Sequence, residues 1–392
     1  MMPSHSEKIR AIQLLLKYLE AEDVKYIFGI PGGPLMPLYE AMHDLGRIRP
    51  ILAKHEQGAA FMADSYARVS GGLGVCCATT GPGATNLLTG VTCAYADSIP
   101  MLVLTAQIAT GAFGKGACQE STSFGVDVFE MFKPVTKMSA MLVTGEKMGD
   151  TIRLALRTAL TGRRGPVHLS LPADLVKKLV PAGIVSPRHY RTTTASVDRE
   201  AIKRASQSLL RAKKPAILVG SGTNLSCAHP ELRTLAERLS IPVVTSPKAK
   251  GAFPEDHLLS LGVFGFAGSP RADSYLLSGE VDTLLVVGSS LGEFSTHTWD
   301  RKLQPATLIQ IDIDPREIGK NYSTSIGIVG DAKACLKELN DQLDADLRWK
   351  DAIDETLSAR QESVRQFKER VPRCLTPEKL LSDALPIKPQ RL

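Results

Sequence analysis

The sequence lacks the features that mark several classes of protein. Its seven cysteines are an odd number without C-x-x-C spacing, which argues against a disulfide framework and a zinc knuckle. There is no run of about 18 apolar residues, as a membrane span requires, and the first residues, MMPSHSEKIR, are too polar for a signal peptide. We therefore expect a cytoplasmic protein with no membrane association.

Concentrated positive charge and phosphate-binding fingerprints are missing too. The net charge is +6, but Lys and Arg are scattered, so no nucleic-acid partner is expected. No G-x-x-x-x-G-K-[ST] occurs, and the GGLG at Gly71 precedes a strand rather than a helix. What remains is an ordinary globular composition, 43% hydrophobic and 22% charged, in a chain of 392 residues that suits two or three domains.

Strand-like and helix-like segments alternate along the chain. Short apolar runs such as VKYIFGI, GVCCATT and PMLVLTAQ are separated by segments with apolar residues at helical spacing. We expect one helix from Ser6 to Ala21 and another that starts just after Glu56. This alternation predicts the α/β class, with two doubly wound, mostly parallel sheets and a helical tail.

The composition also suggests where the domains divide. Residues 181–196 are poor in large apolar side chains and have no clear period, so they are interpreted as a linker. The first domain then covers residues 1–180 and a Rossmann-like middle domain covers residues 197–345. Residues 346–392 are expected to form a connecting helix and the truncated start of a third domain.

Glycine-rich turns close two strands of the first domain. Pro31-Gly32-Gly33-Pro34 follows VKYIFGI, and Gly81-Pro82-Gly83 follows LGVCCATT. Open α/β sheets bind ligands at such strand ends, and Glu56 is expected to face one of them. From the residues alone, the more usual explanation of Glu56 is an acidic residue near the positive end of a helix dipole.

Four segments together resemble the pyrimidine-binding domain of the thiamine diphosphate-dependent enzymes, most closely the acetolactate synthase group. They are FGIPGGPLMPLYEA, KHEQGAAFMADSYARV, TTGPGATNLLTGVTCAYADSIPMLVLTAQ and GACQE. The resemblance covers most of the first 180 residues and implies two catalytic residues, Glu56 at N1′ of the aminopyrimidine and Gln119 at the reacting centre. It implies cofactor contacts from Ile30, Pro31, Gly32, Glu56, Thr79, Pro82, Asn86 and Gln119. His55 is either functional or a residue that starts the helix, and Glu120 and Asp97 are interpreted as structural.

The middle domain resembles the part of the family that holds FAD, through PATLIQIDIDPREIGKN and VGDAKACLKEL. A candidate nucleotide pocket is formed by Gly220, Ser221, Gly222, Asp312 and Ile313. Such carboxylates at strand ends about equally often cap the next helix. Where the family carries an arginine-bearing stretch this chain has GSSLGEF, which leaves FAD binding open. Cys118 stands where acetolactate synthases usually have Phe, which weakens pyruvate as the donor.

The motifs of the family's third domain do not occur in the sequence. There is no Gly-Asp-Gly and no Asn pair to hold Mg²⁺, so we expect no metal ligands in this chain and no activity from it alone. The resemblance implies a homodimer or tetramer, with the diphosphate-binding domain supplied by a longer chain or by a separate subunit.

The expected reaction is decarboxylation of a small 2-oxo acid and carboligation, as in branched-chain amino acid biosynthesis. A 2-oxo acid decarboxylase, a sulfoacetaldehyde acetyltransferase-like enzyme and a non-catalytic nucleotide- or partner-binding protein are the alternatives.

Overall fold

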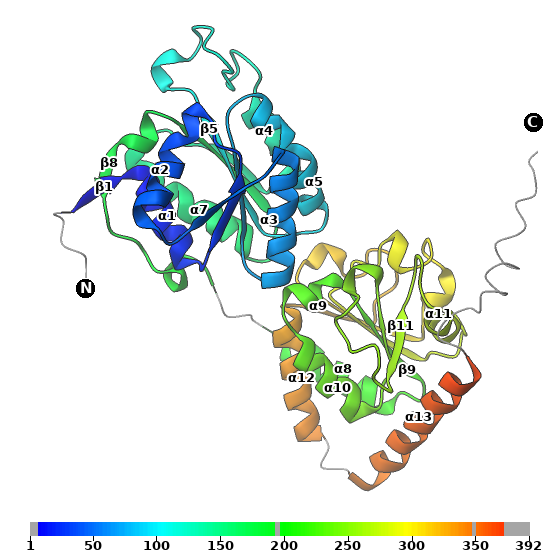
Figure 1. Cartoon of the computed structure of the whole chain (residues 1–392). Coiled ribbons are helices and arrows are strands. Elements are labelled where there is room, and N and C mark those ends of the chain that lie inside the picture. Colours follow the sequence, from blue (N-terminus) through cyan, green and yellow to red (C-terminus); the bar gives the residue numbers. More distant parts are fainter. Residues whose placement is uncertain (1–6, 193–196, 347–349, 372–392) are drawn as a thin grey trace, which may run out of the picture. The chain divides into compact units, whose positions relative to one another are not determined.

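The structure is a computed structural model that describes residues 7–192, 197–346 and 350–371. The chain divides into two compact units, residues 1–194 and residues 195–392 (Figure 1). Within the described residues each unit contains one six-stranded sheet whose strands are all parallel. The predicted α/β class with two mostly parallel sheets is therefore confirmed.

The sheet of unit 1 has the strand order β3-β2-β4-β5-β7-β6. Its strands are β2 (Tyr26–Gly29), β3 (Arg49–Leu52), β4 (Gly74–Ala78), β5 (Met101–Gln107), β6 (Met138–Met141) and β7 (Pro166–Pro172). The chain moves outward from β2 to β3 and then returns to place β4 on the other side of β2. The order thus reverses between β2 and β4, and the crevice at such a switch point is where open α/β sheets bind ligands.

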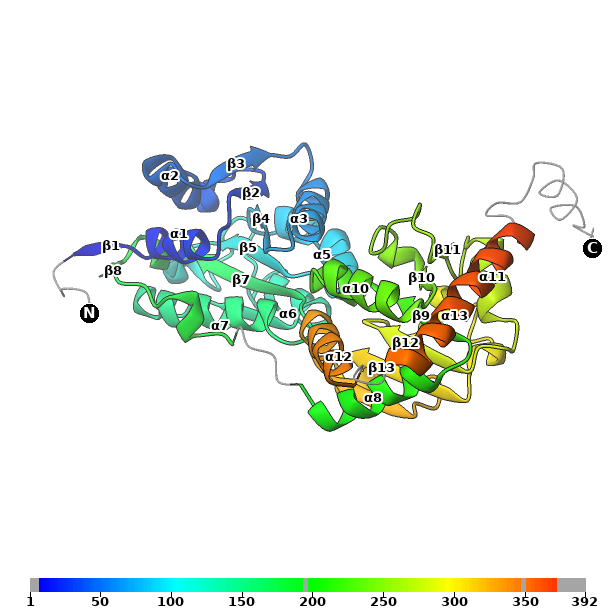
Figure 2. The ribbon, with the colours of Figure 1, turned by 90° about the horizontal axis from the view of Figure 1, so that it is seen from below.

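Helices cover both faces of this sheet. They are α1 (Ala11–Ala21), α2 (Met36–Leu45), α3 (Glu56–Ser70), α4 (Pro82–Asn86), α5 (Leu88–Ala96), α6 (Val128–Phe132) and α7 (Met148–Leu160). Helices α1, α2 and α7 pack on one face, and α3 and α5 pack together on the other (Figures 1 and 2). Because both faces are covered, every residue of β4, β5 and β7 is buried, which explains their unbroken apolar runs.

The predicted helix from Ser6 to Ala21 is wrong at its beginning. Residue 6 lies outside the described residues, and Lys8–Arg10 forms strand β1. This strand pairs in antiparallel register with β8 (Leu179–Pro181), so that Ile9 lies opposite Val180. The helical spacing of the apolar residues is a local signal, whereas the pairing depends on a segment far along the chain. Only α1 keeps the predicted helical form.

Unit 2 repeats the doubly wound plan with the order β11-β10-β9-β12-β13-β14. Its strands are β9 (Pro215–Val219), β10 (Val243–Thr245), β11 (Ser260–Val263), β12 (Thr283–Val287), β13 (Thr307–Asp312) and β14 (Ile326–Val329). Its helices are α8 (Arg199–Arg211), α9 (Ser221–Leu225), α10 (His229–Leu239), α11 (Pro270–Leu276), α12 (Ala332–Asp346) and α13 (Lys350–Arg370). Here the order reverses between β9 and β12.

The helix expected after Leu347 is present as α13, which runs across unit 2 (Figure 2). It packs through Val364 and Phe367, which are 2% and 9% exposed, and the Phe367 ring meets Tyr275 edge-on at 5.1 Å. The further helix expected at LTPEKLLSDAL, residues 375–385, lies outside the described residues.

The described cysteines are all free thiols. Cys76 and Cys77 lie in the middle of β4 and are fully buried, and burial raises the pKa of the Cys77 thiol to about 12. A thiol with such a pKa stays protonated at neutral pH and is a poor nucleophile. These two residues therefore contribute to packing, as the sequence predicted.

Candidate active site

Glu56 is the first residue of α3, where the chain turns from β3 into the helix. His55 is the N-cap, with an extended backbone, and its Nδ1 accepts a hydrogen bond of 3.2 Å from the backbone N–H of Gln57. The structure therefore favours the second interpretation of His55, a residue that starts the helix. Glu56 lies inside the first turn rather than just ahead of it, and it is half-buried.

The carboxylate of Glu56 is held on one side only. Asn86, the last residue of α4, donates a hydrogen bond of 3.0 Å from Nδ2 to Oε2 of Glu56. Among the described residues, Oε1 has no hydrogen-bond partner. The side chain is thus oriented through one oxygen while the other stays available to a ligand.

Glycines allow the loops after β2 and β4 to meet at this carboxylate. A Cβ placed on Gly83 would lie 2.8 Å from Thr79 Cγ2 and 3.2 Å from Glu56 Oε1. A Cβ placed on Gly32 would lie 2.5 Å from Thr79 Cβ. Both distances are shorter than those at which side-chain atoms normally pack. The space beside Thr79 and Glu56 therefore exists because Gly32 and Gly83 have no side chain.

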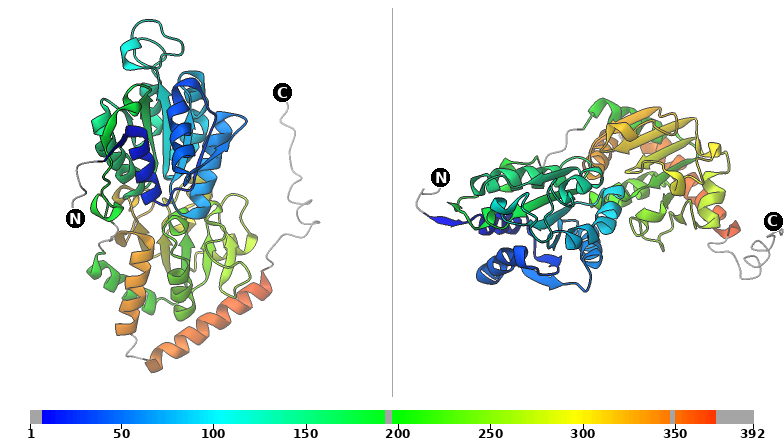
Figure 3. Two further views of the ribbon diagram at one scale, coloured as in Figure 1. Left: turned by 60° about the vertical axis from the view of Figure 1, so that its left-hand side comes forward. Right: turned by 90° about the horizontal axis from the view of Figure 1, so that it is seen from above.

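Gln119 reaches the same strand edge through the segment between β5 and α6, which stands out beyond the ends of the strands (Figure 3). Thr80 donates a hydrogen bond of 2.8 Å from Oγ1 to the backbone carbonyl of Gln119. Gly81, whose φ of +65° favours glycine, would place a Cβ 3.0 Å from Gln119 Cβ. The exposed side chain of Gln119 is therefore next to the turn that follows β4.

The remaining predicted residues of unit 1 lie at the same edge. Ile30 and Pro31 directly follow β2, and Pro82 is the first residue of α4. Ile30 is half-buried, whereas Pro31 and Pro82 are exposed. The hydrogen bond between Asn86 and Glu56 and the close approaches at Gly32 and Gly83 bring these residues together with Thr79. Ile30, Pro31 and Pro82 are placed only by their position at the strand ends.

In unit 2 the glycines of the candidate nucleotide pocket bring two strands together. The N–H of Gly220 donates to the carbonyl of Val287 at 2.8 Å, and the N–H of Gly222 donates to the carbonyl of Gly288 at 3.0 Å. A Cβ on Gly220 would lie 2.1 Å from the Gly288 carbonyl oxygen. These two N–H groups are therefore engaged in the contact between the ends of β9 and β12, with Ser221 between them.

Asp312 and Ile313 follow at the end of β13, the strand next to β12. Asp312 is 8% exposed, and its Oδ1 accepts a hydrogen bond of 2.9 Å from the N–H of Asp314. Asp314 caps the following turn by accepting from the N–H of Arg316. Ile313 is 39% exposed at this edge. The five residues thus share one strand edge at the switch point of the second sheet.

Each of the two units matches the profile of a known protein domain. The profile of the thiamine pyrophosphate enzyme N-terminal TPP binding domain matches residues 9–130, and that of the thiamine pyrophosphate enzyme central domain matches residues 202–339. This chain belongs to the thiamine pyrophosphate enzyme family. The resemblance inferred from the sequence motifs is therefore confirmed.

Several relatives in this family are named as acetolactate synthase large subunits. A probable acetolactate synthase large subunit of Methanocaldococcus jannaschii is 42% identical over 338 residues, 84% of this chain and 56% of the relative. One of Methanococcus aeolicus is 40% identical over 391 residues, 97% and 63% of the two chains. The isozyme 3 large subunit of Escherichia coli is 38% identical over 338 residues, 85% and 58% of the two chains. This chain thus spans about three-fifths of the length of these relatives.

The residues of unit 1 fit the pyrimidine end of the family's cofactor. The cradle beside Glu56 is one that a Cβ on Gly83 would fill, and Oε1 of Glu56 points an unpaired acceptor or a protonated donor at it. Asn86, by binding Oε2, leaves this single oxygen for the ring. A heteroaromatic nitrogen is a suitable partner for such a group.

Sequence reasoning missed the residues that hold the Gln119 segment. Ser121 Oγ shares a hydrogen bond of 2.6 Å with Thr80 Oγ1 and accepts one of 2.8 Å from the N–H of Gly81. Gln107 Oε1 accepts from the N–H of Ser121 at 3.2 Å. The position of Thr80 directly before Gly-Pro-Gly was the available signal, but its partners lie about forty residues further along the chain.

Two acidic residues interpreted as structural have structural contacts. Glu120 Oε1 accepts hydrogen bonds from the N–H of Gly114 at 2.8 Å and from Thr122 Oγ1 at 2.6 Å, and so ties the same segment to itself. Asp97 accepts a bond of 2.8 Å from Arg68 Nη2. Neither of these contacts involves Glu56 or Gln119.

Proposed function

We propose that this protein catalyses thiamine diphosphate-dependent decarboxylation of a 2-oxo acid followed by carboligation, as an acetolactate synthase-like enzyme. One observation carries the proposal, the half-held carboxylate of Glu56 in a cradle between Gly83 and Thr79 at the switch point of the first sheet. The names of the relatives, which are acetolactate synthase large subunits, support it.

Each residue of this site has a separate role. Glu56 exchanges a proton with the pyrimidine nitrogen through Oε1, and Asn86 keeps the carboxyl plane fixed. Gly32 and Gly83 leave room for the ring, and Ile30, Pro31, Thr79 and Pro82 flank it. Gln119 extends toward the substrate. When bound, thiamine diphosphate supplies the electron sink that makes decarboxylation of a 2-oxo acid feasible.

The metal and the flavin enter the proposal differently. Among the described residues no group of three His, Cys, Asp or Glu side chains is suited to hold a metal ion. We assign Mg²⁺ to the family's third domain, whose Gly-Asp-Gly and Asn-pair motifs do not occur in this sequence. FAD is assigned to the edge formed by Gly220, Ser221, Gly222, Asp312 and Ile313, at low occupancy.

For the assembly we propose a homodimer or tetramer, or pairing with a separate subunit that supplies the diphosphate-binding domain. Exposed apolar side chains on α3 support a partner surface, with Val69 90% and Met62 41% exposed. Tyr95 on the neighbouring α5 is 45% exposed. The relatives are themselves named as large subunits.

A cytoplasmic location completes the proposal. The free thiols of the described cysteines fit a reducing compartment. Within the described residues no helix has the length and apolar character needed to cross a membrane.

Cys118 supports a second candidate reaction. It is exposed and directly precedes Gln119, so a small thiol rather than a large ring borders the substrate side of the site. A 2-oxo acid decarboxylase or a sulfoacetaldehyde acetyltransferase-like enzyme would use the same Glu56 and a different acceptor.

Product analysis tests the proposal in a chimaera, in which this chain is continued by the C-terminal part of the M. jannaschii relative. We expect acetolactate from pyruvate when thiamine diphosphate and Mg²⁺ are present. Acetaldehyde alone would identify the decarboxylase. Absence of turnover of any 2-oxo acid, together with no binding of thiamine diphosphate, would favour the non-catalytic binding protein.

A further inference from the structure

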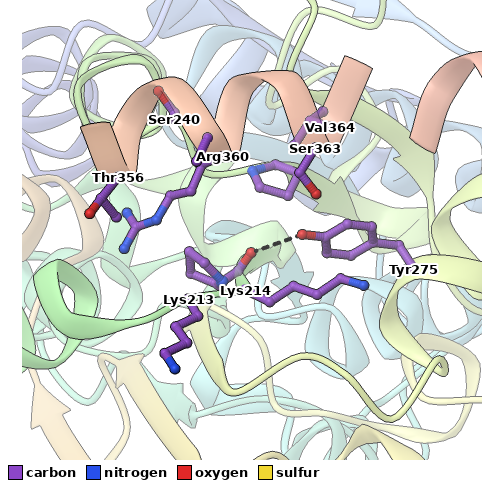
Figure 4. Close-up of a pocket in the computed structure, with 11 residues that line it drawn as sticks. Lys213, Lys214, Ser240, Tyr275, Thr356, Arg360, Ser363 and Val364 are labelled. Atoms are coloured by element: carbon purple, nitrogen blue, oxygen red, sulfur yellow. Dashed lines mark hydrogen bonds between the residues drawn. The ribbon is translucent and has the colours of Figure 1, made fainter. Parts of the chain in front are cut away.

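A pocket of about 220 Å³ lies in unit 2 between α13 and the amino-terminal ends of the strands (Figure 4). Lys213 and Lys214 directly precede β9, and Ser240 directly follows α10. Arg360 and Ser363 reach the pocket from α13. The pocket is therefore at the edge of the sheet opposite Gly220 and Asp312, and it belongs to neither candidate site described above.

Arg360 is a buried cation at the wall of this pocket. It is 5% exposed, and it donates from Nη1 to the carbonyl of Leu239 and from Nη2 to the carbonyl of Leu209, both at 2.9 Å. These carbonyls belong to the last turns of α10 and α8. Among the described residues, Nε–H of Arg360 has no hydrogen-bond partner. The guanidinium is thus held by neutral carbonyls and retains an unpaired N–H.

The other lining residues favour negative charge. The complete lining contains three cations, four hydroxyl-bearing residues and no Asp or Glu: Lys213, Lys214, Pro215, Ser240, Pro242, Tyr275, Thr356, Ala359, Arg360, Ser363 and Val364. Lys214 forms an ion pair with Glu280, whereas Lys213 has no ion pair among the described residues. Asp282 accepts the backbone N–H groups of both lysines, at 2.7 and 3.1 Å, and does not line the pocket.

We propose that this pocket binds a phosphate group, free or as part of a small phosphomonoester. Arg360 supplies the buried positive charge, and Lys213, Ser240 and Ser363 supply donors. Common ligand pockets measure roughly 300–1,000 Å³, so this smaller space suits a compact oxyanion. A cation would face the positive charges of Lys213 and Arg360.

The bound anion would join α13 to the rest of unit 2, because its ligands come from both sides of the pocket. Ser363 and Arg360 belong to α13, and Lys213 and Ser240 belong to the segments beneath it. A ligand that binds only the folded state raises stability in proportion to the logarithm of its concentration above Kd. Phosphate should therefore stabilise the docking of α13.

Calorimetric titration of the complete 392-residue chain tests the proposal with two probes, inorganic phosphate and glycerol phosphate. Sodium chloride at matched ionic strength is the reference. We expect saturable binding of at least one probe to a single site, with a rise in the thermal unfolding midpoint. Tighter binding of glycerol phosphate identifies an esterified ligand, and equal or tighter binding of inorganic phosphate identifies the free ion.

Two variants and a control decide whether the pocket is responsible. Lys213→Gln and Ser363→Ala alter exposed side chains, so folding is retained, and each should weaken binding about tenfold. Lys203→Gln, on the exposed side of α8, should leave binding unchanged. No saturable binding of either probe, or equal binding by the wild type and both pocket variants, would overturn the proposal.

Discussion

Asn86 Nδ2 lies 3.0 Å from Oε2 of Glu56 and joins the end of α4 to the start of α3. Because Asn86 is fixed by the helical turn that follows Gly-Pro-Gly, the orientation of the carboxylate depends on the exit of β4 as well as on its own helix. A site assembled from two strand exits is sensitive to small changes in either one.

Replacing Glu56 by Gln should remove the exchangeable acidic proton while keeping size and shape. In the chimaera with the C-terminal part of the M. jannaschii relative we expect turnover to fall by two to four orders of magnitude, about 3 to 5 kcal/mol of activation barrier. The measurement is the rate of hydrogen–deuterium exchange at C2 of bound thiamine diphosphate. Glu40→Gln, at an exposed carboxylate paired with Arg10, is the control and should exchange at the wild-type rate. Equal exchange in the two variants would remove Glu56 from the mechanism.

Asn86→Ala should leave Glu56 in place but free to rotate. We expect kcat to fall about tenfold with KM changed little, since one hydrogen bond to a charged group contributes roughly 1.5 to 3 kcal/mol when fully lost. Asn86→Asp should be worse, because a second carboxylate would face the first one at hydrogen-bond distance. Steady-state kinetics of both variants, with circular dichroism to confirm folding, make the comparison. Full activity in Asn86→Asp would contradict the proposed orientation.

Gly83→Ala should damage the cradle by overpacking. Its Cβ would lie 2.8 Å from Thr79 Cγ2 and 3.2 Å from Glu56 Oε1, so the loop must shift. We expect a loss of about 1 to 3 kcal/mol in unfolding free energy and weaker binding of the cofactor. Gly58→Ala, within α3, meets nothing within 4 Å and should stabilise the helix by up to about 1 kcal/mol. Urea unfolding measures the change in unfolding free energy in each variant. Similar changes in Gly83→Ala and Gly58→Ala would show that the cradle is not tight.

His168 should make stability depend on pH. It is fully buried in β7, between Thr105 at 2.7 Å and Ser139 at 2.8 Å, and burial lowers its pKa to about 3. Its folded pKa is below the unfolded value of about 6.5, so the unfolded state binds the extra proton between these values. Its contribution is complete above pH 6.5 and decreases, by up to about 1.4 kcal/mol per pH unit, as the pH falls toward 3.

Urea unfolding from pH 7 to pH 4 measures this slope. His168→Gln should lower stability at pH 7 and flatten the slope below pH 6.5. His43→Gln, whose side chain is 91% exposed, should leave the slope unchanged. A slope that His168→Gln does not alter would show that another group titrates.

The purified protein should contain FAD well below one equivalent. The N–H groups of Gly220 and Gly222 are bonded to Val287 and Gly288, and the segment Gly288–Phe294 contains no arginine to hold a diphosphate. Absorbance in the flavin bands, compared with protein concentration after acid release, gives the occupancy. A yellow complex with one flavin per chain would contradict this expectation.

The sequence predicted most of the fold because its signals are local. Apolar runs such as those of β2 and β4 and the glycine turns after them mark parallel strands on their own. It failed at Lys8–Arg10, because the antiparallel partner of β1 is β8, and it did not anticipate β11 or α11. The contacts of Glu56 with Asn86 and of Thr80 with Ser121 also depend on the folded chain, since their members are thirty or more residues apart.

The pairing of β1 with β8 places the first and last strands of unit 1 in one small ladder, with Lys8 opposite Pro181. The strands β1 and β8 are therefore adjacent, as are the terminal segments of domains that tolerate relocation of their termini. A circular permutant of unit 1, opened at an exposed loop and closed by a short glycine linker between these strands, should fold. The same parallel sheet and the cradle at Glu56 would then form from a chain whose segments follow one another in a different order.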